Sequence, residues 1–251
     1  MSAAVVARLR AAGCVFAEEE AALLLGAASG TALDALVARR VGGEPLEQVL
    51  GWAEFCGLRF TVEPGVFVPR QRTRLLVREA VRRAASGAVV LDLCCGTGAV
   101  GAAVATAVGS VELHAADVDP AAVRCARRNV TGSVWCGDLY AALPAGLRGR
   151  VDVLVCNAPY VPTDAIALMP PEARDHELRA ALDGGADGVE VQRRVAAGAP
   201  EWLSPRGRLL VETSGRQTPQ TQAAFTAAGL VDVEVVEDDE LAATVVVGTR
   251  P

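Results

Sequence analysis

From residue 88 onward, short apolar runs alternate with segments whose apolar residues recur at helical spacing. The apolar runs predict seven buried strands, at 88–93, 111–117, 133–138, 151–157, 207–213, 231–237 and 243–249. The segments between them predict helices at 101–108, 121–129, 189–203 and 219–228. Strands that alternate with helices form a largely parallel sheet with helices on both faces, so the expected fold class is α/β. The last two strands follow each other without a helix, which predicts that one of them runs antiparallel at the edge of the sheet.

The first third of the chain has a different pattern. Apolar residues at helical spacing predict short helices at 5–9, 18–25 and 32–40, and a further helix at 73–85. Alternating residues at 58–62, an E-P-G turn and the apolar run 66–68 predict a β-hairpin. We therefore divide the chain into a small N-terminal helical region with a hairpin, at 1–68, and an α/β domain at 69–251.

Composition narrows the class of function. Of the 251 residues, 51% are apolar and 22% are charged, as in an ordinary globular protein. The formal net charge of −6 argues against sequence-independent nucleic-acid binding, which needs clustered cations. The sequence predicts neither a signal peptide nor a membrane span. Seven cysteines include no C-x-x-C pair, so we expect free thiols in a cytoplasmic protein and no metal site.

A glycine-rich loop, L-D-L-C-C-G-T-G-A-V-G, joins the first predicted strand of the sheet to the next helix at 91–101. Gly96 and Gly98 would let the backbone turn sharply and approach a ligand closely. Gly101 would let the helix pack near the sheet. In this strand–turn–helix setting, the loop indicates a binding site for an adenosine-containing cofactor.

Three aspartates indicate which cofactor the loop would hold. Asp117 ends the next strand, where its carboxylate would accept hydrogen bonds from both ribose hydroxyls. Asp138 ends the strand after that, within reach of the exocyclic amine of an adenine ring. Asp92 would repel the pyrophosphate of a dinucleotide such as NAD, but it would attract the amino or sulfonium group of S-adenosylmethionine (SAM). The aspartates therefore favour SAM over NAD.

The segment V-C-N-A-P-Y-V at 155–161 follows the fourth strand of the predicted sheet and reaches the same edge as the glycine loop. An amide or aryl amine nitrogen attacks poorly, because resonance ties up its lone pair. The Asn157 side-chain oxygen and the Ala158 carbonyl would each accept a hydrogen bond from such an NH₂ group, and Tyr160 would pack on its flat face. This arrangement predicts methyl transfer to a planar nitrogen by orientation, without a strong base.

These motifs resemble a known class of enzyme. The loop resembles the D-L-x-x-G-T-G of class I SAM-dependent methyltransferases, and N-A-P-Y resembles the (N/D/S)-P-P-(Y/F/W) of methyltransferases that act on planar nitrogens. The segments 43–51, 54–60 and 64–77 are similar to the region that links the N-terminal helices to the catalytic domain in the HemK/PrmC family. Members of that family are protein-(glutamine-N5) methyltransferases that modify the Gly-Gly-Gln tripeptide of peptide chain release factors. The resemblance runs from about residue 30 to the C-terminus.

The resemblance implies a Rossmann-like fold, SAM as cofactor with S-adenosylhomocysteine as product, and a release factor as the protein partner, with no stable nucleic acid and no membrane involved. It implies that the region 1–68 recognises the substrate. It assigns cofactor binding to Asp92, Cys94, Cys95, Gly96, Thr97, Gly98, Asp117, Asp138, Leu139 and Asn157. It assigns catalysis to Asn157, Pro159 and Tyr160, and substrate binding to these three together with Ala158. Arg70 and Thr73 are added as candidates for either pocket.

The sequence departs from the family pattern in both P-R-P-x-T-E, which here reads P-R-Q-R-T-R, and N-P-P-Y. Arg74 stands where the family has the glutamate of P-R-P-x-T-E, and Ala158 replaces the first proline of N-P-P-Y. The alanine keeps the carbonyl but frees φ. The N-terminal helical region is also shorter than the family's usual bundle. These departures indicate a divergent paralogue and leave two alternatives open, methylation of an exocyclic amine of a nucleic-acid base and a catalytically weak SAM-binding partner of the translation apparatus.

Overall fold

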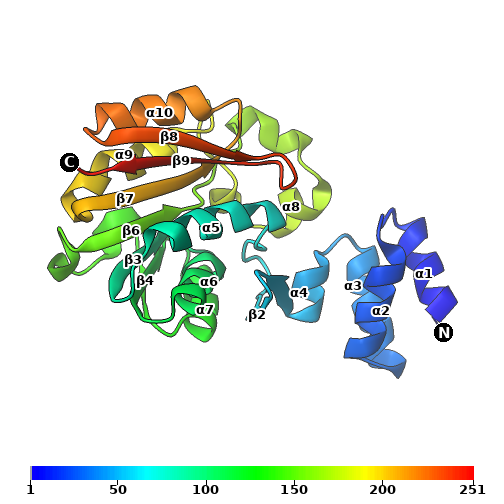
Figure 1. Cartoon of the computed structure of the whole chain (residues 1–251). Helices are drawn as coiled ribbons and strands as arrows, with labels where there is room; N and C mark the ends of the chain where they lie inside the picture. The colour runs from blue at the N-terminus through cyan, green and yellow to red at the C-terminus, as the bar shows by residue number, and fades with distance from the viewer. Residues whose placement is uncertain (1) are drawn as a thin grey trace.

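The computed structural model describes residues 2–251, and its main feature is a seven-stranded sheet (Figure 1). The strands lie in the order β5-β4-β3-β6-β7-β9-β8, and all but β9 run parallel to one another. Their bounds are β3 Ala88–Leu93, β4 Val111–Asp117, β5 Ser133–Cys136, β6 Val151–Cys156, β7 Leu203–Thr213, β8 Val231–Asp238 and β9 Ala243–Thr249. The predicted mostly parallel seven-stranded sheet is confirmed.

Helices cover both faces of this sheet, because its strands are apolar on both sides. Side chains of α5 (Arg74–Arg83), α6 (Ala99–Val108) and α7 (Pro120–Asn129) share one hydrophobic cluster with the sheet. Side chains of α9 (Glu190–Trp202) and α10 (Thr218–Ala227) share a second cluster with its other face. This layering leaves the carboxyl ends of the parallel strands open at one edge, where ligands of such sheets bind.

The N-terminal helices α1 (Ser2–Ala11), α2 (Ala17–Ala27), α3 (Gly30–Val41) and α4 (Leu46–Leu50) stand apart from the sheet (Figure 1). They have a small core of their own, built around Leu9, Leu24 and Val37. The hairpin that follows, β1 (Trp52–Phe55) and β2 (Leu58–Thr61), instead places Phe55 and Phe60 in the core under α5 and α6. The hairpin that we grouped with 1–68 therefore packs against the sheet domain.

Two predictions about strands were wrong in detail. The hairpin pairs 52–55 with 58–61 through a turn at Cys56 and Gly57, and both of these residues have the positive φ of a tight hairpin turn. In the run 66–68, Val66 and Val68 are buried without forming a strand, since the Val68 N–H donates to the Glu177 carboxylate rather than to a neighbouring strand. The antiparallel strand β9 lies between β7 and β8 rather than at the edge. Its position is explained by Ala243–Thr249 being buried at every residue, whereas β8 is half exposed.

Within residues 2–251, no helix combines the length and the apolar character that crossing a bilayer requires.

Candidate functional site

The carboxyl ends of β3, β4 and β6 surround a cavity of about 470 Å³. Thirteen of the fifteen residues selected from the sequence line it, namely Thr73, Asp92, Cys94, Cys95, Gly96, Thr97, Asp117, Asp138, Leu139, Asn157, Ala158, Pro159 and Tyr160. The other two, Arg70 and Gly98, do not. The topology therefore brings the glycine loop and N-A-P-Y into one cavity, as expected from their positions at the ends of neighbouring parallel strands.

The glycine loop turns through three left-handed residues, Cys94 (φ 56°), Gly96 (φ 53°) and Gly98 (φ 76°). Gly98 differs from the prediction, because a Cβ added there would meet a Val130 methyl carbon at 2.5 Å. Its lack of a side chain allows α6 to start against α7 rather than giving a ligand access. Gly101 serves as expected, since an added Cβ would lie 3.0 Å from Asp92 and from Leu113 in the sheet.

Asp92 and Asp117 present one buried and one half-buried carboxyl group to the cavity. Asp92 is 1% exposed, and its Oδ2 accepts a hydrogen bond from the Gly101 N–H at 2.8 Å. Burial raises the pKa of Asp92 to about 7. Asp117 accepts from the Gly96 N–H at 2.8 Å and from the Asp119 N–H at 2.9 Å, while burial raises its pKa. Each carboxylate oxygen can accept a second hydrogen bond, so Asp117 can hold the loop and still receive a ligand hydroxyl.

Asp138 lies at the rim of the cavity rather than in its depth. Its Oδ2 is 2.5 Å from Arg194 Nη2 of α9, and both side chains are about half exposed. Leu139, the next residue, has a positive φ of 47° and lines the same end of the cavity. An adenine amine at this end would share the Asp138 carboxylate with Arg194.

The N-A-P-Y segment leaves β6 at the opposite end of the cavity. Asn157 Nδ2 is 3.4 Å from the Thr73 hydroxyl oxygen, and Ala158 is 1% exposed. The Tyr160 hydroxyl donates to Glu212 Oε1 at 3.3 Å, while Gln217 donates to the Tyr160 carbonyl at 2.8 Å. The segment is therefore held by contacts from three other parts of the chain.

Glu212, near the end of β7, is a residue that the sequence reasoning missed. It is 2% exposed, and its Oε1 lies 3.4 Å from Arg72 Nε. The Arg72 guanidinium also lies 5.6 Å from the centre of the Tyr160 ring. Burial raises the pKa of Glu212, and burial likewise raises that of Tyr160. The signal available in the sequence was an acid at the end of a strand that reaches the same sheet edge as Asn157.

A second missed residue, Glu177, explains where Arg70 points. Both Glu177 carboxylate oxygens lie 2.7 Å from Arg70 Nη2, and one of them also accepts from the Val68 N–H at 3.1 Å. Glu177 follows α8 (Pro171–His176), in the segment between N-A-P-Y and α9. Arg70 thus ties this segment to the linker before α5 and does not enter the cavity.

The same segment also contacts the N-terminal helices. Arg40 of α3 bonds Glu20 of α2 at 2.6 Å and lies 3.4 Å from Glu172 of α8. Gln48 of α4 donates to the carbonyls of Val66 and His176. Side chains of the helical region therefore reach the segment that borders the cavity.

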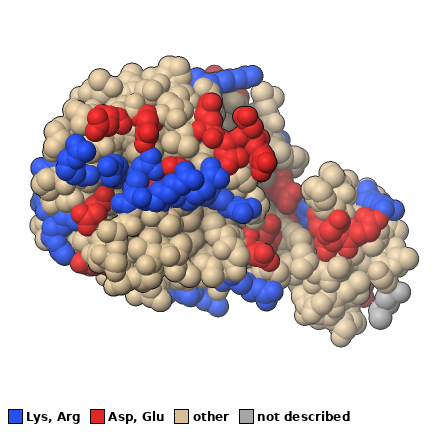
Figure 2. Space-filling model, in the orientation of Figure 1, with Lys and Arg blue, Asp and Glu red and all other residues tan. Residues whose placement is uncertain are grey.

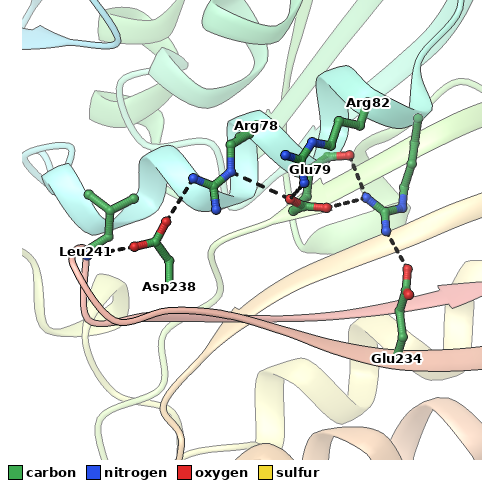
Figure 3. A network of polar contacts seen from close by, with 7 residues as sticks. Arg78, Glu79, Arg82, Glu234, Asp238 and Leu241 are labelled. Atoms are coloured by element: carbon green, nitrogen blue, oxygen red, sulfur yellow. Dashed lines mark hydrogen bonds and ion pairs between the residues drawn. The ribbon is translucent and has the colours of Figure 1, made fainter.

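Figure 2 shows a basic band over α5, and every cation in it is an arginine because the chain has no lysine. Figure 3 shows that carboxylates already neutralise much of this band. The network joins Arg78, Arg82 and Arg83 to Glu79, Glu234 and Asp238. This pairing disfavours the band as a nucleic-acid interface, which needs free cations.

Comparison with known proteins agrees with the geometry of the cavity. The profile of the methyltransferase small domain family matches residues 57–169. A protein of Geobacter sulfurreducens named release factor glutamine methyltransferase is 39% identical over 81% of this chain and 72% of its own. A Streptomyces pristinaespiralis protein named 4-amino-L-phenylalanine/4-methylamino-L-phenylalanine methyltransferase is 36% identical over 77% of this chain and 69% of its own. In fold, the chain is similar to a methyltransferase of Pyrococcus furiosus, with a TM-score of 0.59 at 17% identity over 85% of this chain and 96% of that one. The chain belongs to the release factor glutamine methyltransferase family.

Proposed function

We propose that this protein uses SAM to methylate the side-chain amide nitrogen of a glutamine in a protein, and that the acceptor is a peptide chain release factor. The observation that carries the proposal is the shared cavity, in which Asn157 at the end of β6 faces the same space as the glycine loop and Asp117. The name of the Geobacter sulfurreducens relative supports the release factor as acceptor.

The residues around the cavity fit SAM in size and in charge. A volume of about 470 Å³ lies within the range for ligands of this size. Asp117 would hold the ribose hydroxyls, Leu139 and Asp138 would flank the adenine, and Asp92 would face the cationic end. When bound, SAM supplies a methyl group activated by a sulfonium sulfur.

The chain's own residues would act on the acceptor by orientation. Asn157 Oδ1 and the Ala158 carbonyl would accept hydrogen bonds from the two N–H groups of the amide, which turns its lone pair toward the methyl group. Tyr160 would pack on the amide plane, and Pro159 would limit the backbone freedom of this turn. The nitrogen becomes more acidic as its new bond forms, so its proton leaves to water without a strong base. Orientation of this kind contributes several kcal/mol, roughly, to the lowering of the barrier.

A second candidate acceptor is the aryl amine of a small molecule. The observation that favours it is the likeness to the Streptomyces pristinaespiralis enzyme, whose name specifies such an acceptor. Phe67, Met169, Leu178 and Leu182 also give the cavity apolar walls that an aromatic ring would fit.

The experiment compares the wild-type protein with Asn157→Ala, using a release factor, 4-amino-L-phenylalanine and RNA as separate acceptors. Mass spectrometry of tryptic peptides would find a gain of one methyl group at the glutamine of the release factor, and calorimetry would follow SAM binding. We expect N157A to lose transfer and to keep SAM binding within a few-fold, while Gln220→Ala, an exposed change on α10, keeps both. Methylation of the aryl amine alone would select the second candidate. Unchanged transfer by N157A, or equal loss of transfer and SAM binding, would contradict the role of Asn157.

A further inference from the structure

One buried atom near the site has no partner. Glu212 Oε2 is fully enclosed, and within residues 2–251 no hydrogen bond of normal geometry reaches it. A carboxylate oxygen left unpaired in the interior is costly, so its position calls for an explanation. Glu212 follows Val211, which pairs in register with Cys156, the residue before Asn157. The unpaired oxygen is therefore on the strand next to the proposed acceptor site.

Thr73 connects the two residues, because its side chain contacts Asn157 and is also a hydrogen-bond partner of the Glu212 carboxyl group. It is 1% exposed, and its hydroxyl oxygen is the atom that Asn157 Nδ2 approaches at 3.4 Å. A hydroxyl that accepts a hydrogen bond still has its own hydrogen to donate. An ionised carboxylate accepts only, so beside Glu212 the hydroxyl is constrained to donate toward the acid and to accept from Asn157.

We propose that Glu212 is a positioning residue that, through the Thr73 hydroxyl, determines which end of the Asn157 side-chain amide faces the acceptor. This inference rests on the proposed function, because it concerns the presentation of Asn157 to an NH₂ group. The two ends of an asparagine amide are almost equal in size, so packing alone does not distinguish them. With Nδ2 directed to Thr73, the Asn157 oxygen faces the cavity and accepts a hydrogen bond from the NH₂ group of the substrate amide. In the reverse orientation, the Asn157 NH₂ group would face the substrate NH₂ group, so two hydrogen-bond donors would meet.

Three polar groups around Glu212 favour its ionised form and so oppose the effect of burial. Arg72 lies 3.4 Å from its Oε1, and the Tyr160 hydroxyl donates to the same oxygen at 3.3 Å. Burial raises the pKa of Glu212, while Thr73, Arg72 and Tyr160 oppose that rise. These are the polar groups that face the carboxylate from the turn before α5 and from the N-A-P-Y segment.

The Asn157 side chain, the Thr73 hydroxyl and the Glu212 carboxylate form a relay of hydrogen bonds, which the following variants would reverse, remove or preserve. Glu212→Gln keeps the side-chain volume but offers an N–H donor to Thr73, which allows the whole sequence of hydrogen bonds to reverse. Thr73→Val removes the hydroxyl, and Thr73→Ser retains it. Glu79→Gln is the matched control, since Glu79 is also 2% exposed but lies on α5, hydrogen-bonded to Arg82.

We expect E212Q and T73V to lower kcat about tenfold to a hundredfold with the KM for SAM unchanged, which corresponds to a loss of roughly 1.4–2.7 kcal/mol in the transition state. The kcat of the double variant should be no lower than that of the less active single variant, because both substitutions act through one relay. T73S and E79Q should stay within about threefold of wild type. Wild-type kcat should also fall on acidification as Glu212 takes up a proton, and E212Q should lack that fall. Three results would each overturn the inference. The losses of kcat in the two single variants could multiply in the double variant, T73S could be inactive, or E212Q could turn over at the wild-type rate.

A second readout needs no turnover, so it separates this inference from the proposed function. The chain contains only two asparagines, Asn129 and Asn157. Labelling with ¹⁵N-asparagine therefore gives two side-chain NH₂ signals, and Asn129, which bonds Thr61 and Thr97, is an internal reference. We expect E212Q and T73V to shift the Asn157 signal and speed its hydrogen exchange, while the Asn129 signal stays in place. An unmoved Asn157 signal would refute the relay whatever the acceptor proves to be, and a moved signal without methyl transfer would contradict the proposed function alone.

Discussion

Asp92 should make the stability of this protein depend on pH in a way that one substitution removes. Its carboxyl is 1% exposed at the end of β3, with the Gly101 N–H as its hydrogen-bond donor. Burial raises its pKa from 3.8 to about 7. A carboxyl whose pKa is higher in the folded state binds its proton more tightly there. Its contribution to stability is therefore complete below pH 3.8 and is lost as the pH rises through about 7.

The size of the effect follows from these two pKa values. A difference of about 3 in pKa, at about 1.4 kcal/mol for each unit, makes ionised Asp92 cost about 4 kcal/mol of folding free energy well above neutral pH. Between about pH 5 and about pH 8, the same two values give a loss of about 2.5 kcal/mol. Asp92→Asn keeps an oxygen to accept from the Gly101 N–H but does not ionise. As the pH is raised from about 5 to about 8, the unfolding free energy of D92N should therefore rise relative to that of the wild type by about 2.5 kcal/mol.

Urea unfolding of both proteins at the two pH values measures this difference, and subtracting one protein from the other cancels the titration of the remaining groups. Because Asp92 lines the cavity, a cation bound there would favour its ionised form. Saturating SAM should therefore reduce the advantage of D92N at about pH 8. A difference between the two proteins that does not change with pH would refute the reasoning, since Asp92 would then be ionised at little cost throughout the interval.

Two further substitutions test the packing of the site. Gly98→Ala would add a Cβ 2.5 Å from a valine methyl carbon at a φ of 76°, so we expect urea unfolding to show a loss of roughly 2–4 kcal/mol. Gly26→Ala, in a helix and with open space around its Cβ position, should instead be neutral or stabilising, and equal losses would show that the contact is not the cause. Glu177→Gln should lose about 1–2 kcal/mol and raise the KM for the acceptor more than that for SAM, because the charge that holds Arg70 is removed. Asp187→Asn, at an exposed ion pair, should change stability by less than about 0.5 kcal/mol, and an E177Q variant that behaves in the same way would argue against the tie to Arg70.

The parts of the site that could be predicted from the sequence are those that local pattern determines. Asp92, Asp117 and Asn157 end apolar runs that are buried strands, and parallel strands bring their carboxyl ends to one edge. The glycine loop was recognisable because its spacing follows a strand and opens a helix. Gly98 shows the limit of such reasoning, since the conformation was foreseen but the reason for it, contact with α7, was not.

The acceptor side of the cavity was less predictable because contacts between distant residues build it. Thr73 and Asn157 are 84 residues apart in the chain, and Tyr160 and Glu212 are 52 apart. No local spacing connects such residues, and an acid at the end of a strand is more often exposed than buried. The hairpin was misplaced for a related reason, since Val66 and Val68 alternate like a strand but are buried by packing against separate segments.

The two halves of the site also differ in what supports them, and this difference bears on how the acceptor could change during divergence. The half that we propose holds the cofactor is supported by backbone hydrogen bonds to Asp92 and Asp117 within the sheet domain, so changes at these residues act directly on the glycine loop and the start of α6. The segment beside the acceptor half is tied through Glu177 to the linker before α5, and through Glu172 to Arg40 of the N-terminal helices. Substitutions in the helical region can therefore alter the position of this segment while the proposed cofactor pocket keeps its own contacts. The names of the two relatives specify different acceptors, a release factor glutamine and an amino-phenylalanine, and this arrangement allows divergence of that kind.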